Sequence, residues 1–130
     1  MSKILSMREL VPTIYEAVVE APDIAKKAKA GEFLAVMPDE KGERVPLTIA
    51  DFDRVKGTLT IVFMAIGTST HKLAKMKAGD SYYAFVGPLG HASEIENYGT
   101  VVLVAGGVGT APIYPIAREM KKAGNKVVCI

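Results

Sequence analysis

The sequence contains a single cysteine, Cys129, among its 130 residues. A lone cysteine excludes an internal disulfide and a metal site built from cysteines, and it fits a reducing cytoplasm. The chain also has only two histidines, too few beside one cysteine for a structural zinc. We therefore expect a cytoplasmic protein without a bound metal.

Neither sign of charge dominates the chain. Sixteen lysines and arginines stand against fourteen acidic residues, which gives a net charge of +2. The basic residues are scattered, whereas a nucleic-acid-binding protein concentrates them on one face. We therefore expect no nucleic-acid partner.

The chain also lacks a regular membrane-spanning segment. Tyr98–Ala117 carries no charge and is long enough to span a bilayer, but it contains three glycines and two prolines between Gly106 and Pro115. These residues interrupt the regular hydrogen bonding that a spanning helix needs. Arg8 and Glu9 occupy the stretch where a signal peptide would be apolar, so neither a membrane nor a secretion signal is expected.

What the chain does contain is enough apolar sequence for a folded core: 49% of its residues are hydrophobic and 23% are charged. Its first two-thirds predict β-strands, most strongly at Thr58–Ile66, where apolar side chains alternate. The less perfect alternation of Ile14–Glu20 suggests a bulge there. The fold class that follows is a six-stranded antiparallel Greek-key β-barrel. The expected strands are Ile4–Leu10, Thr13–Ala21, Glu32–Met37, Val45–Ala50, Thr58–Ile66 and Ser81–Val86, with short helices at Ile24–Ala28 and His71–Met76.

After Gly90 the pattern changes to that of an α/β protein. A buried strand at Val101–Ala105, a helix at Pro112–Ala123 and a strand at Lys126–Ile130 form one βαβ unit. We place the boundary so that residues 1–97 form the barrel and residues 98–130 begin an incomplete α/β domain. One βαβ unit cannot cover both faces of its sheet, so we expect the chain to be a piece of a longer protein.

The turn between that strand and helix is rich in glycine. Gly107-x-Gly109-x-x-Pro112 resembles a dinucleotide fingerprint in which proline replaces the third glycine, and Gly106 and Val108 complete the turn. A helix start that follows a strand aims backbone N–H groups and the positive helix end at one point, where a pyrophosphate can bind. The alternative is a tight strand-to-helix turn without a ligand.

Two further segments are candidates for ligand binding. Arg44 stands beside Pro46, Leu47 and Thr48 at the start of a predicted strand, where a guanidinium can pair with phosphate and the next residues offer an apolar wall and a hydroxyl. Gly67, Thr68, Ser69 and Thr70 follow the strongest strand and precede a helix. The alternatives are an ordinary edge strand for the first and a simple helix N-cap for the second.

Four motifs in this order resemble the ferredoxin–NADP reductase superfamily. Within it, the chain is most similar to the flavin subunits of dihydroorotate dehydrogenases, of sulfide dehydrogenases and of NADH-dependent ferredoxin:NADP oxidoreductases. The likeness covers essentially the whole chain. Its motifs are Pro46–Asp51, Gly67–Thr70, Gly87–Gly90 and Ala105–Pro112.

The resemblance implies a flavoprotein. FAD would lie against the barrel, with Pro46, Leu47 and Thr48 along its ring and Gly67–Thr70 on its pyrophosphate. The turn from Gly106 through Val108 to Pro112 would face NAD(P) in the full-length protein. The resemblance also implies a larger catalytic subunit as partner and a [2Fe-2S] centre.

Two departures from the family pattern stand out. The superfamily's flavin motif is Arg-x-Tyr-Ser/Thr; if Thr48 is its last residue, Val45 occupies the arginine position and Pro-Leu replaces x-Tyr, so that Arg44 lies one residue early. The cysteines of the [2Fe-2S] cluster are absent, and Cys129 is expected to be a buried small apolar residue.

The function that the sequence supports is an FAD-binding fragment of an electron-transfer subunit, carrying electrons between NAD(P)H and an iron–sulfur centre or partner subunit. Such chemistry belongs to the cofactor and needs no acid, base or nucleophile from the protein, so no catalytic residue is assigned. The chain alone is not expected to oxidise NAD(P)H efficiently. The alternative is a non-catalytic β-barrel that serves as a binding or interaction module.

Overall fold

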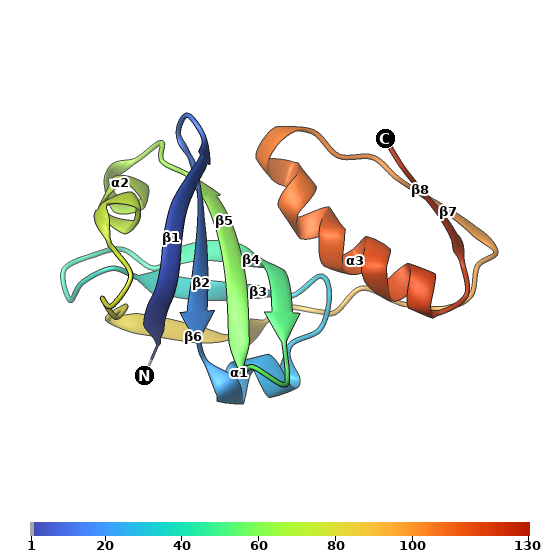
Figure 1. Ribbon diagram of the computed structural model, residues 1–130, viewed down its shortest axis with the longest axis horizontal. Helices are drawn as coiled ribbons and strands as arrows, with labels where there is room; N and C mark the ends of the chain where they lie inside the picture. Colours follow the sequence, from blue (N-terminus) through green and yellow to red (C-terminus); the bar gives the residue numbers. More distant parts are fainter. Residues whose placement is uncertain (1) are drawn as a thin grey trace.

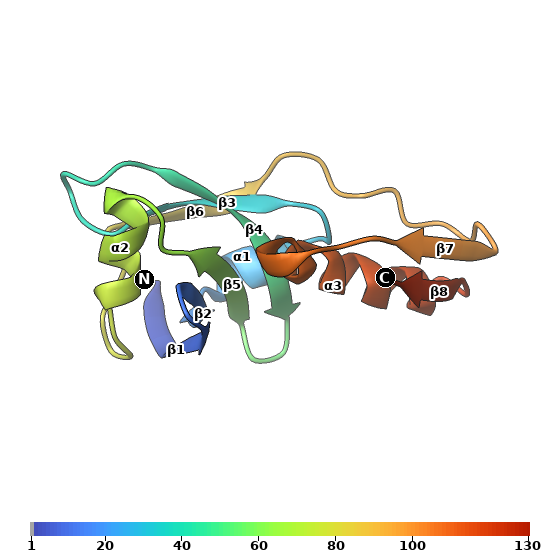
Figure 2. The same ribbon diagram turned by 90° about the horizontal axis from the view of Figure 1, so that it is seen from above.

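The computed structural model describes residues 2–130 and shows a six-stranded antiparallel sheet with short helices, followed by a longer helix and a two-stranded parallel sheet (Figure 1). The six-stranded sheet lies at one end of the molecule, and α3, β7 and β8 lie at the opposite end (Figure 2). The elements are β1 (Lys3–Val11), β2 (Ile14–Glu20), α1 (Pro22–Lys27), β3 (Phe33–Met37), β4 (Val45–Asp53), β5 (Thr58–Met64), α2 (Thr68–Lys75), β6 (Ala84–Leu89), β7 (Thr100–Leu103), the 3-10 turn η1 (Gly107–Gly109), α3 (Thr110–Lys122) and β8 (Lys126–Cys129).

The alternation of β5 decides which side of the sheet forms the core. Leu59, Ile61 and Phe63 are buried, while Thr60 and Val62 between them face outward. The other strands contribute their own buried sets, and Figure 1 shows β3, β4 and β6 crossing behind β1, β2 and β5, with the core between the two groups.

The strands pair in the order β1-β2-β5-β4-β3-β6, so β1 and β6 are the two ends of the sheet. The segment before β6 approaches β1: the Ile4 N–H donates to the Asp80 carbonyl at 2.8 Å and the Gly79 N–H to the Ile4 carbonyl at 2.8 Å. One isolated bridge, Lys3 to Ser81, joins the two ends. The antiparallel six-stranded part of the predicted fold is confirmed. No ladder joins β1 to β6 in the described residues, so closure of the sheet into a barrel stays a prediction.

Three sequence predictions need correction. Within the β1–β2 pair the bulges lie in β1, at Leu5 and Leu10, and not in β2, whose register with β5 is continuous. Helix α2 begins at Thr68, three residues before the predicted start at His71. Strand β5 ends at Met64, two residues before the predicted end at Ile66, which is 75% exposed.

The sixth strand also differs from the prediction, because it runs through Gly87 and Pro88 to Leu89 instead of ending at Val86. A Cβ at Gly87 would lie 2.4 Å from Leu34 Cδ2. The missing side chain lets β6 pass close over β3, where Leu89 pairs with Phe33 after a register shift. Glycine, usually a strand breaker, is here the residue that permits the pairing.

The βαβ unit has the predicted order of elements, with β7 and β8 parallel and Val101 opposite Val127. Asn125, which is buried, fixes this unit to the preceding connector. Its side-chain amide donates to the carbonyls of Glu96 at 2.7 Å and Met120 at 2.9 Å, and its Oδ1 accepts the N–H groups of Tyr98 and Gly99. A buried amide with both of its ends satisfied in this way is a structural residue that the sequence did not reveal.

Candidate functional site

A crevice with a volume of about 580 Å³ separates the outer face of the sheet from the start of α3. Volumes of this size are typical of small-molecule and cofactor sites, which span about 300–1,000 Å³. Strands β1, β2, β4 and β5 form one wall, and the glycine-rich turn and the first turns of α3 form the other. The lining residues are Leu10, Val11, Ile14, Glu16, Val18, Ala50, Asp51, Thr60, Val62, Gly107, Val108, Thr110, Ala111 and Tyr114.

The crevice is largely apolar, and no lysine or arginine is among its lining residues. Its two carboxylates already have cationic partners: Glu16 accepts a hydrogen bond from Arg8 Nε at 2.8 Å, and Asp51 pairs with Arg118. An uncharged, flat group suits such walls, whereas a polyphosphate would meet acidic neighbours without a cation in the wall to balance them.

A second hollow, with a volume of about 640 Å³, lies at the N-terminus of α2. Figure 1 shows α2 and the turn before α3 on opposite sides of the β1–β2 hairpin. Two lysines line this hollow, and the helix start adds N–H groups and the positive end of the helix dipole. The second hollow therefore favours anions, whereas the lining of the crevice contains no cation. Its lining residues are Ile66, Gly67, Thr68, His71, Lys72 and Lys75.

Thr70 organises the start of α2. Its Oγ1 accepts the N–H groups of Ile66 and Gly67, both at 2.9 Å, and donates to the Gly67 carbonyl at 3.1 Å. The Nδ1 of His71 lies 2.7 Å from the same carbonyl. The hydroxyl of Thr70 is therefore engaged in shaping the turn, and the lysine side chains and remaining N–H groups of the first turn are what the helix offers to an anion.

Lys72 also pairs with Asp39, from the loop after β3, at 3.1 Å. The hydrogen bond from Lys72, together with its charge, holds the pKa of the Asp39 carboxyl below its usual range. Because both side chains are substantially exposed, this pair contributes little to stability.

The glycines of the two predicted binding turns have no packing role within the chain. A Cβ at Gly106 or Gly109 would have no atom within 4 Å, and a Cβ at Gly67 would approach only Thr70 Oγ1, at 3.9 Å. The backbone of Gly67 and Gly106 is extended, a conformation open to any residue. Only Gly107, with φ +57°, needs glycine for its conformation. Open space over such glycines fits a ligand that approaches the backbone closely.

The predicted site residues fall into three places. Gly107 and Val108 line the crevice, and Gly67 and Thr68 line the second hollow. Neither Arg44 nor the segment Pro46–Thr48 lines either space: Arg44 is exposed just before β4, and Leu47 and Thr48 pair with Leu34 and Phe33 of β3. Gly106, Gly109 and Pro112 flank the crevice-lining turn without lining it, as Ser69 and Thr70 do at the second hollow.

Sequence reasoning missed most of the crevice wall. Thr60 and Val62 had a detectable signal, because they occupy the outward positions of an alternating strand. Glu16 and Tyr114 had none, because only the packing of α3 against the sheet brings them into one cavity. Cys129 was expected to be buried and is exposed at the end of β8.

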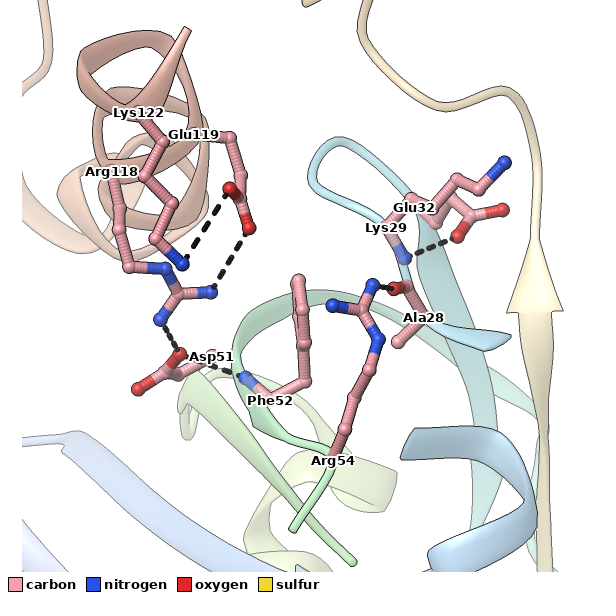
Figure 3. A network of polar contacts seen from close by, with 9 residues as sticks. All are labelled: Ala28, Lys29, Glu32, Asp51, Phe52, Arg54, Arg118, Glu119 and Lys122. Atoms are coloured by element: carbon pink, nitrogen blue, oxygen red, sulfur yellow. Dashed lines mark hydrogen bonds and ion pairs between the residues drawn. The ribbon is translucent and has the colours of Figure 1, made fainter. Parts of the chain in front are cut away.

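A polar network joins α3 to the sheet (Figure 3). Arg118 pairs with Asp51 of β4, and its guanidinium lies 4.9 Å from the ring centre of Phe52; the guanidinium of Arg54 lies 4.7 Å from the same ring. Partial burial by itself would lower the pKa of Arg118, but the hydrogen bond and charge of Asp51, with the charge of Glu119, raise it above its ordinary value. The network therefore fixes the crevice's helical wall through a permanently charged arginine.

No family model matches the sequence. Curated relatives do: the chain is 41% identical over 130 residues to a protein of Thermotoga maritima named dihydroorotate dehydrogenase B (NAD(+)) electron transfer subunit homolog, covering 100% of this chain and 46% of the relative. It is 34% identical to the dihydroorotate dehydrogenase B electron transfer subunit of Desulforamulus reducens, covering 92% of this chain and 47% of the relative.

Solved structures agree with these relatives. A structure of an NADH-dependent reduced ferredoxin-NADP oxidoreductase superposes with a TM-score of 0.97 at 41% identity, over 99% of this chain and 47% of that one. In sequence and in fold, the chain resembles the ferredoxin–NADP reductase superfamily. Phthalate dioxygenase reductase, with a TM-score of 0.79 and 19% identity, shares the fold over 98% of this chain and 41% of its own.

This ferredoxin–NADP reductase-like chain spans about half the length of the curated relatives it matches. Those relatives are, by name, an electron transfer subunit homolog and an electron transfer subunit of dihydroorotate dehydrogenase B. Within residues 2–130, none of the helices is both long and apolar enough to pass through a bilayer.

Proposed function

We propose that this chain binds FAD and forms the flavin-binding part of an electron-transfer subunit that links NAD(P)H to an iron–sulfur centre or a partner subunit. The observation that carries the proposal is the apolar crevice of about 580 Å³, bordered by a turn whose glycines face open space. The 41% identity to an electron transfer subunit homolog supports the same assignment.

The crevice and the second hollow suit differently charged parts of the proposed ligand. The uncharged ring system suits the crevice, whose lining includes no cation, and the phosphates suit the helix start with Lys72 and Lys75. Thr48 directly precedes the buried Ile49 and so faces outward, toward the same side of the sheet as the crevice. This supports a place for Pro46 and Thr48 along the ring, with Gly67, Thr68, Ser69 and Thr70 at the pyrophosphate. Leu47, which we also assign to the ring, packs partly buried against the core. The contribution of Arg44 is a phosphate contact made from the rim, because its side chain is exposed.

The other wall of the crevice suits a nicotinamide dinucleotide in the full-length protein. Gly107 and Val108 line the crevice, Gly106 and Gly109 flank them, and Pro112 lies in the first turn of α3. When bound, flavin accepts a hydride from nicotinamide and can release electrons one at a time. The protein's part is to hold both rings against one another and away from water. We assign these roles to a flavin-binding barrel of residues 1–97 and to the start of an NAD(P)-binding domain at residues 98–130.

A [2Fe-2S] cluster does not fit the residues of this chain, which has one cysteine where such clusters use four cysteine ligands. Cys129 is exposed on β8, and the described residues contain no group of three or more His, Cys, Asp and Glu side chains arranged to hold a metal. We therefore assign the iron–sulfur centre to other segments or to the larger catalytic subunit that we propose as partner.

The proposal is tested by titrating the purified chain with FAD while following flavin fluorescence and visible absorbance. We expect saturable binding, a yellow protein and weaker binding of riboflavin, which lacks the pyrophosphate. Gly67→Ala should weaken FAD binding with an unchanged melting temperature, because the backbone there is extended and the added Cβ meets open space. A chain that stays colourless and does not take up FAD would overturn the proposal in favour of a non-catalytic interaction module.

A further inference from the structure

Tyr114 is the one aromatic residue among those that line the crevice. It lies in the first half of α3, and its side chain is 55% exposed although it borders a cavity whose other lining residues are small, aliphatic or acidic. An aromatic ring left half exposed at the mouth of an apolar cavity retains a large surface to bury against a ligand.

The ring of Tyr114 is held in place by its neighbours. The guanidinium of Arg118, four residues later and so on the same face of the helix, lies 5.7 Å from the ring centre. Arg118 is in turn paired with Asp51 of β4. The series Asp51, Arg118 and Tyr114 thus runs from the sheet to the helix and fixes the phenol beside the cavity.

The opposite wall offers no aromatic partner of its own. Thr60, Val62 and Val18 present hydroxyl and aliphatic surface. A planar ligand in this crevice therefore has an aliphatic wall on the sheet side and one aromatic ring on the helix side.

We propose that Tyr114 is the positioning residue of the crevice and stacks on the planar ring of the bound flavin. The inference rests on the proposed function and adds the group that orients the ring. Aromatic stacking contributes affinity through the ring itself, so phenylalanine can replace tyrosine in this respect. Only the phenol, which is easily oxidised, quenches the fluorescence of a flavin in contact with it.

The experiment measures FAD affinity and bound-flavin fluorescence for the full 130-residue chain and for Tyr114→Phe and Tyr114→Ala. Tyr98→Ala is the matched control, since Tyr98 is 52% exposed and lies outside the crevice. We expect Tyr114→Ala to bind FAD about three- to tenfold more weakly and with brighter bound flavin. Tyr114→Phe should keep the affinity but not the quenching, and Tyr98→Ala should match the parent chain.

Each outcome decides one point. If the parent chain binds FAD and Tyr114→Ala matches it in both affinity and fluorescence, the role of Tyr114 is overturned while the proposed function stands. If the parent chain does not bind FAD, both are overturned. Far-UV circular dichroism and the melting temperature of each variant establish that a loss of binding does not reflect a loss of fold.

Discussion

At the scale of single residues, the glycines divide into those that the fold requires and those that it leaves unexplained. Gly31 has φ +94°, and a Cβ there would lie 2.3 Å from Ser93 Oγ and 2.8 Å from Ser93 N. Gly67 and Gly106 have neither a positive φ nor a close neighbour. The second class borders the two hollows, which is why its members are assigned to ligand binding rather than to packing.

This division predicts different costs for two alanine substitutions. Gly79 has φ +97°, close to that of Gly31, but a Cβ there would meet nothing within 4 Å. We expect Gly79→Ala to cost about 1 kcal/mol from the backbone conformation alone. Gly31→Ala adds a clash with backbone and should cost about 1–3 kcal/mol more. Urea unfolding measures both, and equal losses would show that Ser93 moves aside without cost.

At the scale of elements, the docking of α3 on β4 sets the width of the crevice. The docking combines a partly exposed ion pair, Arg118 with Asp51, and a phenylalanine ring between two guanidinium groups. Such ion pairs contribute about 0–1 kcal/mol, and each exposed cation–π contact about 0.5–1 kcal/mol. The contacts are individually modest, but the two that join α3 to β4, the ion pair with Asp51 and the cation–π contact with Phe52, both depend on Arg118.

Replacing that arginine therefore tests the docking. Arg118→Met keeps the apolar stem but removes the ion pair and the cation–π contacts, and we expect it to lower the free energy of unfolding by about 1–2 kcal/mol. Lys122→Met is the control: Lys122 lies one turn later and, among residues 2–130, pairs only with Glu119 on its own helix, at 3.8 Å. Urea unfolding should show a loss of at most a few tenths of a kcal/mol for the control. Similar losses in the two variants would contradict a docking role for Arg118.

At the scale of the whole molecule, the two parts are unequally protected. The six-stranded sheet encloses a continuous core, whereas the pair β7–β8 is covered by one helix and leaves apolar side chains exposed on its other face. A two-stranded sheet supported in this way has little local stability. The exposed residues are Val102 at 55%, Val104 at 71%, Val128 at 37% and Ile130 at 73%.

Hydrogen exchange measures the difference in local stability between the two sheets. We expect the amides of β7 and β8 to exchange faster than those in the centre of β2 and β5, because the small sheet opens without unfolding the large one. The Ile130 N–H, which donates to the Leu103 carbonyl at 2.8 Å, is a useful reporter for the small sheet, and Ile61 in β5 is one for the large sheet. Equal protection of the two amides would mean that the molecule unfolds as one cooperative unit.

The sequence alone determined the positions of most strands and of the βαβ unit. Local periodicity is enough for this: Leu59, Ile61 and Phe63 alternate in a way that only a half-buried strand explains, and Gly124 marks the end of α3. The glycine-rich turns were also visible, because a strand followed by glycine and a helix start is itself a local pattern.

The tertiary structure alone decided how these pieces form a site. It placed Gly67 and Gly107 at separate hollows, brought Glu16 and Tyr114 to one crevice and paired Arg118 with Asp51 across 67 residues of chain. It also carried β6 through Gly87, against the local preference of glycine and proline. These contacts depend on which faces of the strands and helices pack together in the folded chain. The packing is set by burial and strand register over distant segments, so no short stretch of sequence can reveal it.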